Sequence, residues 1–199
     1  MTSTLRHPKN DAAQATPRSL TSRSLHWLIT LLVIFQGLLG YANLHVAWFH
    51  ERLATGMLVH EEAGLILLGL TLWMLMLRWI EGRRPADGLS KRQAQLAGMM
   101  HAALYLLIFI QSALGIWMMG LLGRGLTLFF WHVGLPITAD PRLVFGGVLQ
   151  IHAAVAALLA FAIVVHALAA FHHHFVLRDN VLRHMLPWRT VTSRIASSR

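Results

Sequence analysis

The sequence predicts an all-α integral membrane protein, folded as a four-helix bundle within a lipid bilayer. The chain has 199 residues, of which 56% are hydrophobic and only 13% are charged, a composition too apolar for a soluble domain of this size. Hydropathy rises in four separate stretches of about 20 residues, the length that an α-helix needs to cross the hydrocarbon core. Most Lys and Arg residues lie beyond the ends of these stretches, in the loops and tails that set the topology.

Four apolar spans follow one another along the chain, at residues 25–42, 57–79, 96–120 and 144–171. The first span is similar to a secretory signal, but no small-x-small cleavage site follows it, so we expect a retained membrane anchor. Residues 1–20 are polar and lack apolar periodicity, which predicts a disordered cytoplasmic tail. The membrane domain should then occupy residues 21–188, with a second cytoplasmic tail at 189–199.

The charge balance of the loops predicts which ends face the cytoplasm. The chain carries a formal net charge of +9, and its 17 Lys and Arg residues divide very unequally between the two sides. Fourteen of them fall in the two tails and the second loop, whereas the other side holds only Arg52, Arg124 and Arg142. Basic loops stay on the cytoplasmic side, so both termini should be cytoplasmic in a bacterial inner membrane. The basic residues form no single patch, so we expect no nucleic-acid binding.

Four histidines lie within or at the ends of the apolar spans, at two different depths: His26, His60, His152 and His166. Ionisable side chains are costly in the membrane, so each is a candidate functional residue. His152 and His166 are separated by about 21 Å of helical rise and return to within about 40° of the same helix face. In the predicted topology, His152 can face His60 at the outer level, and His166 can face His26 at the inner level.

Two imidazoles at each level suit haem better than a metal ion held by protein ligands alone. A pair of histidines fills both axial positions of a haem iron, whereas zinc needs at least three protein ligands. The chain has no cysteine, which excludes thiolate ligands and covalent haem attachment. Haems between the helices with closed coordination would carry electrons and would not bind gas. The spacing alone leaves open that these histidines are interfacial residues or hydrogen-bond partners between helices.

Short motifs at both ends of the membrane domain are distinctive in combination. They are Ser24-Leu25-His26-Trp27-Leu28 and Val59-His60 at the starts of the first two spans, Trp131, Gly134 and Pro136 in the third loop, and Arg178-Asp179-Asn180-Val181-Leu182-Arg183-His184-Met185-Leu186-Pro187 after the fourth span. Together with His152 and His166, these motifs resemble the prokaryotic cytochrome b561 family over nearly all of residues 20–188.

The resemblance implies a function as well as a fold. In that family the four matching histidines ligate two haem b groups in a four-helix bundle. The activity described for it is electron exchange with the quinone pool, including oxidation of superoxide with reduction of ubiquinone. We therefore expect an oxidoreductase whose partners are the lipid bilayer, a quinone and superoxide.

Three further histidines are candidates for contacts with a quinone or with haem propionates. His101 lies near the start of the third span and competes with His26 as an inner ligand, although the resemblance implies a histidine there that is not a ligand. His173 and His174 follow the fourth span, and the resemblance implies that they line such a site. The alternatives are a buried structural histidine at 101 and an interface-anchoring cluster at 172–174.

Other polar residues of the spans have plainer expected roles. Gln36 and Gln111 fall near the middle of the membrane, where their amides should hydrogen-bond between helices. Glu61 and Glu62 follow His60 and are expected at a solvated helix start, where acidic side chains suit the helix dipole. The alternative is that they orient a ligand or act in proton exchange.

Two other functions stay open on the sequence alone. One is a haem-b membrane subunit that anchors a soluble dehydrogenase or hydrogenase and relays its electrons. The other is a transporter whose pathway is lined by bare histidines, which would be colourless. The sequence assigns no role to residues 1–20, His45 or His50, and it does not identify the physiological electron donor.

Overall fold

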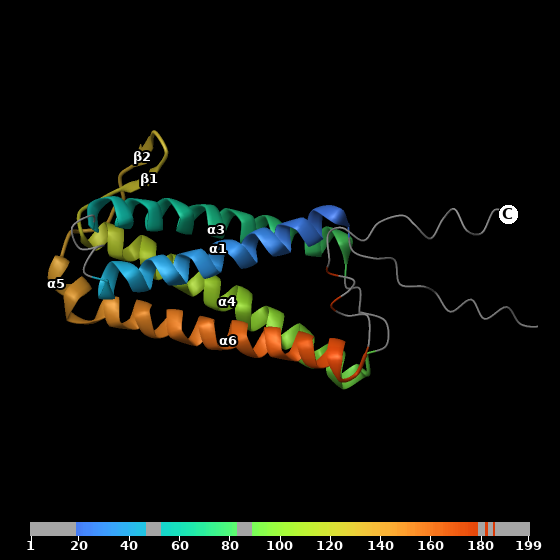
Figure 1. The fold of residues 1–199 in the computed structure, drawn as a ribbon. Coiled ribbons are helices and arrows are strands. Elements are labelled where there is room, and N and C mark those ends of the chain that lie inside the picture. Colours follow the sequence, from blue (N-terminus) through green and yellow to red (C-terminus); the bar gives the residue numbers. More distant parts are fainter. Residues whose placement is uncertain (1–18, 47–52, 83–88, 179–181, 183–184, 186–199) are drawn as a thin grey trace, which may run out of the picture.

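The computed structural model describes residues 19–46, 53–82, 89–178, 182 and 185. Four long helices run along one another in Figure 1: α1 (Leu20–His45), α3 (Leu53–Glu81), α4 (Lys91–Leu121) and α6 (Leu149–Phe175). Each of them, the last together with the turns that lead into it, is long and apolar enough to cross a membrane. The predicted four-helix membrane bundle is therefore confirmed.

The helices extend beyond the apolar spans because polar side chains cap them. Ser19 Oγ accepts a hydrogen bond from the Ser22 backbone N–H at 3.1 Å, so α1 begins before the predicted span. Ser90 and Gln93 form a reciprocal capping box, so α4 also begins early, at Lys91. Such caps satisfy the first backbone N–H groups of a helix, and hydropathy does not detect them. The predicted disorder of residues 1–20 falls almost wholly on residues 1–18, which lie outside the described part of the chain.

A π-helical turn leads into the fourth long helix. The Asp140 side chain accepts a hydrogen bond from the Arg142 N–H and caps the short helix α5 (Pro141–Leu143), and the π turn η1 (Val144–Val148) follows. Such turns are rare and often lie beside functional sites. Here the π turn ends one helical turn before His152.

The helices pack as two antiparallel pairs. α1 packs along α3 and α4 packs along α6, whereas the backbone of α6 approaches α1 and α3 closely at few positions. A buried apolar cluster joins all four helices near mid-bundle: Leu25, Ile29, Leu67, Met74, Ile108 and Leu159. Many apolar side chains on the outer faces stay exposed, such as Leu38 and Phe161, each 66% exposed. An aqueous protein rarely shows so much apolar surface, whereas lipid covers it in a membrane.

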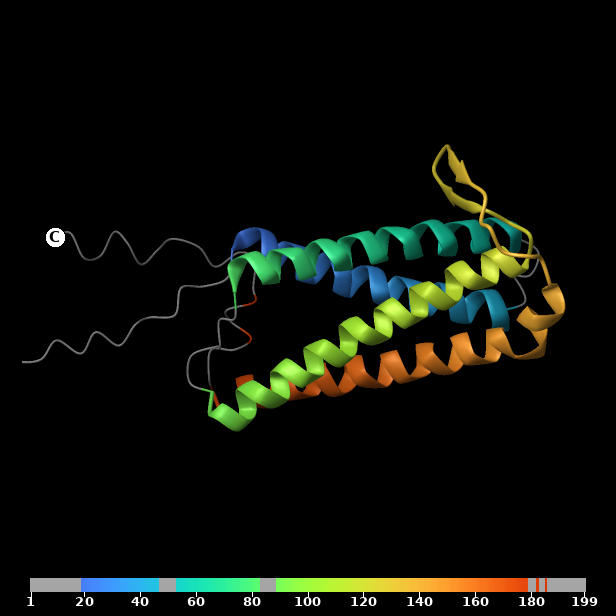
Figure 2. The ribbon, with the colours of Figure 1, turned by 180° about the vertical axis from the view of Figure 1, so that it is seen from behind.

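A short β-hairpin interrupts the otherwise helical chain. Strands β1 (Leu126–Leu128) and β2 (Trp131–Val133) pair antiparallel, with Leu128 opposite Trp131. The sequence prediction missed this hairpin because Phe129 and Phe130 form its turn, and they are not typical hairpin-turn residues. Figures 1 and 2 both show the hairpin projecting sideways from one end of the bundle, beside the start of α3.

The bundle thus has two distinct ends, which we name by their neighbours. The hairpin end holds β1, β2 and the starts of α3 and α6. The tail end holds the starts of α1 and α4 and the ends of α3 and α6 (Figure 2).

Candidate functional site

Two pairs of histidines face each other across the bundle, one near each end. The rings of His60 on α3 and His152 on α6 have centroids 6.3 Å apart, near the hairpin end. The rings of His26 on α1 and His166 on α6 have centroids 6.5 Å apart, near the tail end. Helix α6 therefore contributes one imidazole to each level. The structure brings together the same pairs that the depth argument predicts, while their role as ligands stays a prediction.

The spacing within each pair fits one iron held between two imidazoles. A metal–nitrogen bond is about 2 Å long, and the ring centre lies about 1 Å beyond the nitrogen. Two imidazoles on opposite sides of one iron therefore have centroids about 6 Å apart. The planes of the rings are inclined by 74° at the hairpin level and by 55° at the tail level. Axial imidazoles can rotate about their bonds to iron, so both inclinations are compatible with a haem.

The two helices that supply each pair are not packed closely on each other. α6 packs on α4, and α1 packs on α3, so neither pair joins two helices in continuous contact. Among the described residues, no group of three or more His, Asp or Glu side chains could hold a metal ion. The paired histidines therefore suit a cofactor that supplies the remaining ligands itself, and cofactors of this kind bind between the helices of bundles.

Glycines lie against both histidine rings of the hairpin level. A Cβ at Gly40 on α1 would lie 3.2 Å from His60 Cε1, and a Cβ at Gly115 on α4 would lie 3.6 Å from His152 Cε1. The Nδ1 atoms of both rings are buried and have no hydrogen-bond partner in the described part of the chain. Small residues thus let α1 and α4 approach the two imidazoles closely.

His101 adds a third histidine at the tail level. Its ring centroid lies 5.0 Å from that of His166, at an angle of 75°. This distance is shorter than the roughly 6 Å that two axial ligands of one iron require. His101 Nδ1 also lies 2.6 Å from the Ala97 carbonyl oxygen, which favours an Nδ1–H that donates to it. The geometry at the tail level therefore favours His26 over His101 as the partner of His166.

One buried and one half-buried arginine lie beside the tail level, which the charge count of the loops does not predict. Arg23 is only 3% exposed, whereas a purely topological charge would lie in solvent. Ser22 Oγ donates to Glu81 Oε1 at 2.9 Å, and Ser19 also donates to this carboxylate, so α1 and α3 are joined there. The Arg78 guanidinium lies over the Tyr105 ring, 5.2 Å from its centroid. A predicted interface position does not by itself distinguish a buried arginine from a solvated one.

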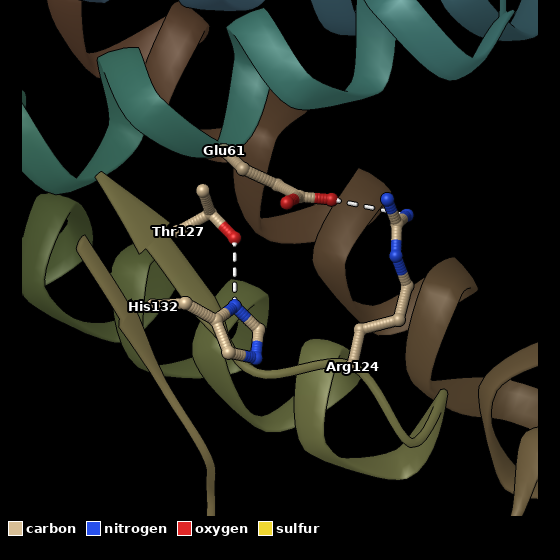
Figure 3. Close-up of polar contacts among 4 residues, drawn as sticks. All are labelled: Glu61, Arg124, Thr127 and His132. Carbon is tan, nitrogen blue, oxygen red and sulfur yellow. Dashed lines mark hydrogen bonds and ion pairs between the residues drawn. The ribbon is translucent and has the colours of Figure 1, made fainter. Parts of the chain in front are cut away.

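The hairpin is fixed over α3 by acidic side chains next to His60. Arg124 and Glu61 form an ion pair of 3.3 Å, shown in Figure 3, and the Glu61 side chain is only 9% exposed. Glu62 accepts a hydrogen bond from the Phe129 backbone N–H at 3.1 Å. The expectation of a solvated helix start is therefore wrong, because α3 begins at Leu53, two turns before these residues, and the hairpin lies beside them.

The remaining predicted polar residues occupy varied positions. Gln36 donates to the His60 carbonyl oxygen at 2.8 Å, so its predicted bond between helices is confirmed. Gln111 Oε1 is buried and accepts no hydrogen bond from any described residue. His173 and His174 lie in the last turn of α6, where the His173 ring contacts His172 and the His174 ring contacts Phe175.

Of the two histidines without an assigned role, only His45 is described. It ends α1, is exposed, and its ring centroid lies 4.5 Å from that of Tyr41. His50 lies outside the described residues. On the exposed hairpin itself, His132 Nδ1 lies 3.1 Å from Thr127 Oγ1 (Figure 3).

Three proteins with assigned names are similar to this chain over most of its length. The "Cytochrome b561 homolog 1" of Escherichia coli (strain K12) is 29% identical over 178 residues, 86% of this chain and 97% of that protein. The "Probable superoxide oxidase CybB" of Yersinia pestis is 28% identical and covers 82% of this chain and 92% of its own. The "Cytochrome b562" of Cereibacter sphaeroides is 29% identical, with 82% and 90% covered.

A family model described as prokaryotic cytochrome b561 matches residues 18–188. This match covers all four long helices, the hairpin and all four paired histidines. It agrees with the resemblance found in the sequence motifs and with the two facing pairs of imidazoles. The chain belongs to the prokaryotic cytochrome b561 family, a family of membrane cytochromes that bind b-type haem.

Proposed function

We propose that this chain is a di-haem electron carrier that exchanges electrons with the quinone pool of the membrane. His60 and His152 would hold the haem of the hairpin level, and His26 and His166 that of the tail level. The observation that carries the proposal is the spacing of 6.3 Å and 6.5 Å between the ring centroids of these two pairs. Bound haem iron supplies one-electron chemistry, with both axial positions closed to oxygen.

The protein contributes position and insulation to this chemistry. Two ligands on one rigid helix, α6, would fix the centres about 21 Å apart along the bundle, measured between the ligand positions. Buried Leu159 lies on α6 between His152 and His166, within the apolar cluster that all four helices share, so apolar side chains would surround the path between the two levels. Arg23 and Arg78 place positive charge at the tail end, where anionic propionates of a haem would be stabilised. His101, His173 and His174 remain candidate contacts for these propionates or for a quinone.

We further propose that the electrons come from superoxide and reduce ubiquinone. Two superoxide ions would each lose one electron to give two O₂ molecules, and one quinone would take both electrons with two protons to give the quinol. The name of the Yersinia pestis relative, a probable superoxide oxidase, supports this reading. The hairpin end suits the approach of an anion only in part, because the Arg124 charge is paired with Glu61. Arg142 is the exposed basic residue described there that is not in such a pair.

A flux of superoxide should rapidly reduce the oxidised haems of the purified protein, as followed by their absorption bands. The rate should fall as salt is added, because salt screens the attraction of an anion to exposed positive charge. Arg142→Ala should lower the rate by up to about tenfold at low salt. Added ubiquinone should then reoxidise the haems.

The matched control is Arg92→Ala, which removes an exposed arginine from the tail end and should leave the rate unchanged. Superoxide dismutase should abolish the reduction. If the haems stayed oxidised in the superoxide flux but were reduced by a native membrane-bound dehydrogenase, the superoxide proposal would fail. That result would favour a subunit that anchors a dehydrogenase or hydrogenase. A colourless protein would favour the histidine-lined transporter.

We also propose that both termini are cytoplasmic, with the hairpin end on the opposite side of the membrane. The chain has no cysteine, so single-cysteine variants report one position each. Gly134→Cys, at an exposed glycine after the hairpin, should react with an impermeant maleimide added outside intact spheroplasts. Ser198→Cys should react only after lysis. External labelling of Ser198→Cys with protection of Gly134→Cys would reverse the proposed orientation.

A further inference from the structure

Asn43 is a buried polar residue that has no partner among the residues that the structure describes. It lies on α1 near the hairpin end and is only 3% exposed. Its Oδ1 and Nδ2 atoms are both buried, and neither has a hydrogen-bond partner within residues 19–46, 53–82 and 89–178. A buried amide that makes no hydrogen bond costs about 1–3 kcal/mol, so such a group needs an explanation.

Asn43 belongs to a ladder of contacts between α1 and α3. Gln36, Gly40 and Asn43 lie on one face of α1, and Gly64, His60 and Gly56 lie opposite them in that order along the antiparallel α3. A Cβ at Gly64 would lie 2.8 Å from Gln36 Nε2, and a Cβ at Gly56 would clash with Asn43 Oδ1. The glycines therefore let both amides reach the backbone of α3. His60 lies between the two amides.

The direction of the His60 side chain shows which of these two amides lies on the side of its imidazole ring, and that amide is Asn43. Side chains on a helix lean toward its N-terminus, so the ring of His60 leans toward the turn that contains Gly56. The amide of Asn43 contacts that turn, whereas Gln36 donates to the His60 backbone carbonyl from the other side. His60 Nδ1 is itself buried without a partner. Among the described residues, an unpaired ring nitrogen and an unpaired amide thus lie on adjacent turns of the same interface.

We propose that Asn43 is a positioning residue for His60, whose Nδ1–H reaches Asn43 Oδ1 through one bridging water. This inference rests on the proposed haem site, because the bond would leave Nε2 of His60 free to bind iron. Histidines that bind metals almost always donate their other ring N–H to an oxygen acceptor, which fixes the tautomer and raises the basicity of the ligand. A single water is sufficient to join two such groups when they do not meet directly.

Replacement of Asn43 should change one haem and spare the other. Asn43→Leu keeps the size of the side chain and removes the acceptor, so His60 becomes a weaker donor and the oxidised iron is less stabilised. The midpoint potential of the hairpin-level haem should rise in a potentiometric titration, and its affinity should fall by about 10- to 100-fold. Asn43→Asp keeps an acceptor oxygen, so the potential should stay at or below the wild-type value. The tail-level haem should keep its potential in both variants.

Gln36→Leu is the matched control, because it removes a buried amide from the same face of α1 on the other side of His60. It should weaken the contact between α1 and α3 and leave the hairpin-level potential nearer to the wild-type value than Asn43→Leu does. Equal potentials in the wild type and both Asn43 variants, with two haems still bound, would overturn the inference and leave the proposed function intact. A rise in Asn43→Asp as large as in Asn43→Leu would also overturn it. If the wild-type protein lacked a haem that depends on His60, the proposed site itself would fail.

Discussion

Replacing either His60 or His152 with alanine is expected to remove the same haem from the purified protein. The two rings face each other at 6.3 Å, so each would supply one of two axial bonds to a single iron. Loss of either bond leaves the iron held from one side only, and no group of three or more His, Asp or Glu side chains among the described residues could replace it. Difference spectra of the reduced and oxidised protein, with haem counted per chain, should show about one of two haems lost.

The double variant should lose no more haem than either single variant, because the loss of one ligand is already sufficient to abolish the site. His132→Ala is the matched control, since His132 lies at the same end of the bundle on the exposed hairpin. It should retain both haems. Loss of spectrally different haems in His60→Ala and His152→Ala would refute the pairing.

The number and order of the helices could be read from the sequence, whereas their ends could not. A transmembrane helix needs an apolar stretch of fixed length, which single-sequence hydropathy detects. The extra turns of α1 and α4 are polar and depend on Ser19 and on the box of Ser90 with Gln93. These turns are stabilised by hydrogen bonds to side chains, and hydropathy contains no term for them.

The histidine pairs were predictable because a straight helix converts sequence separation into depth. His152 and His166 share a face of α6 for that reason, and the predicted topology put His60 and His26 at matching depths. The surroundings of the pairs were not predictable in the same way. The ion pair of Glu61 with Arg124 depends on how the hairpin folds back on α3, and the burial of Asn43 depends on a glycine of another helix. Such contacts join residues far apart in the chain, so local patterns carry no signal for them.

For His101, depth in the sequence and distance in the structure lead to different conclusions. By depth alone it competed with His26, because both lie near the tail end of a helix that faces α6. The structure separates them by distance and by hydrogen bonding, since the His101 ring is only 5.0 Å from that of His166 and its Nδ1 already faces the Ala97 carbonyl oxygen.

The second large effect is therefore expected at the tail level, where His166→Ala and His26→Ala should each remove the other haem. His101→Ala should retain both haems, although a shift in the tail-level potential would be consistent with a histidine beside the ligand. Haem counts and difference spectra of the three variants provide the measurement.

Retention of two haems in His26→Ala with loss of one in His101→Ala would make His101 the ligand. In that case the tail-level haem would have to lie between α4 and α6, the helices that pack directly, and these would have to separate to admit it. The close contact of α4 with α6 is the physical reason to expect the opposite outcome.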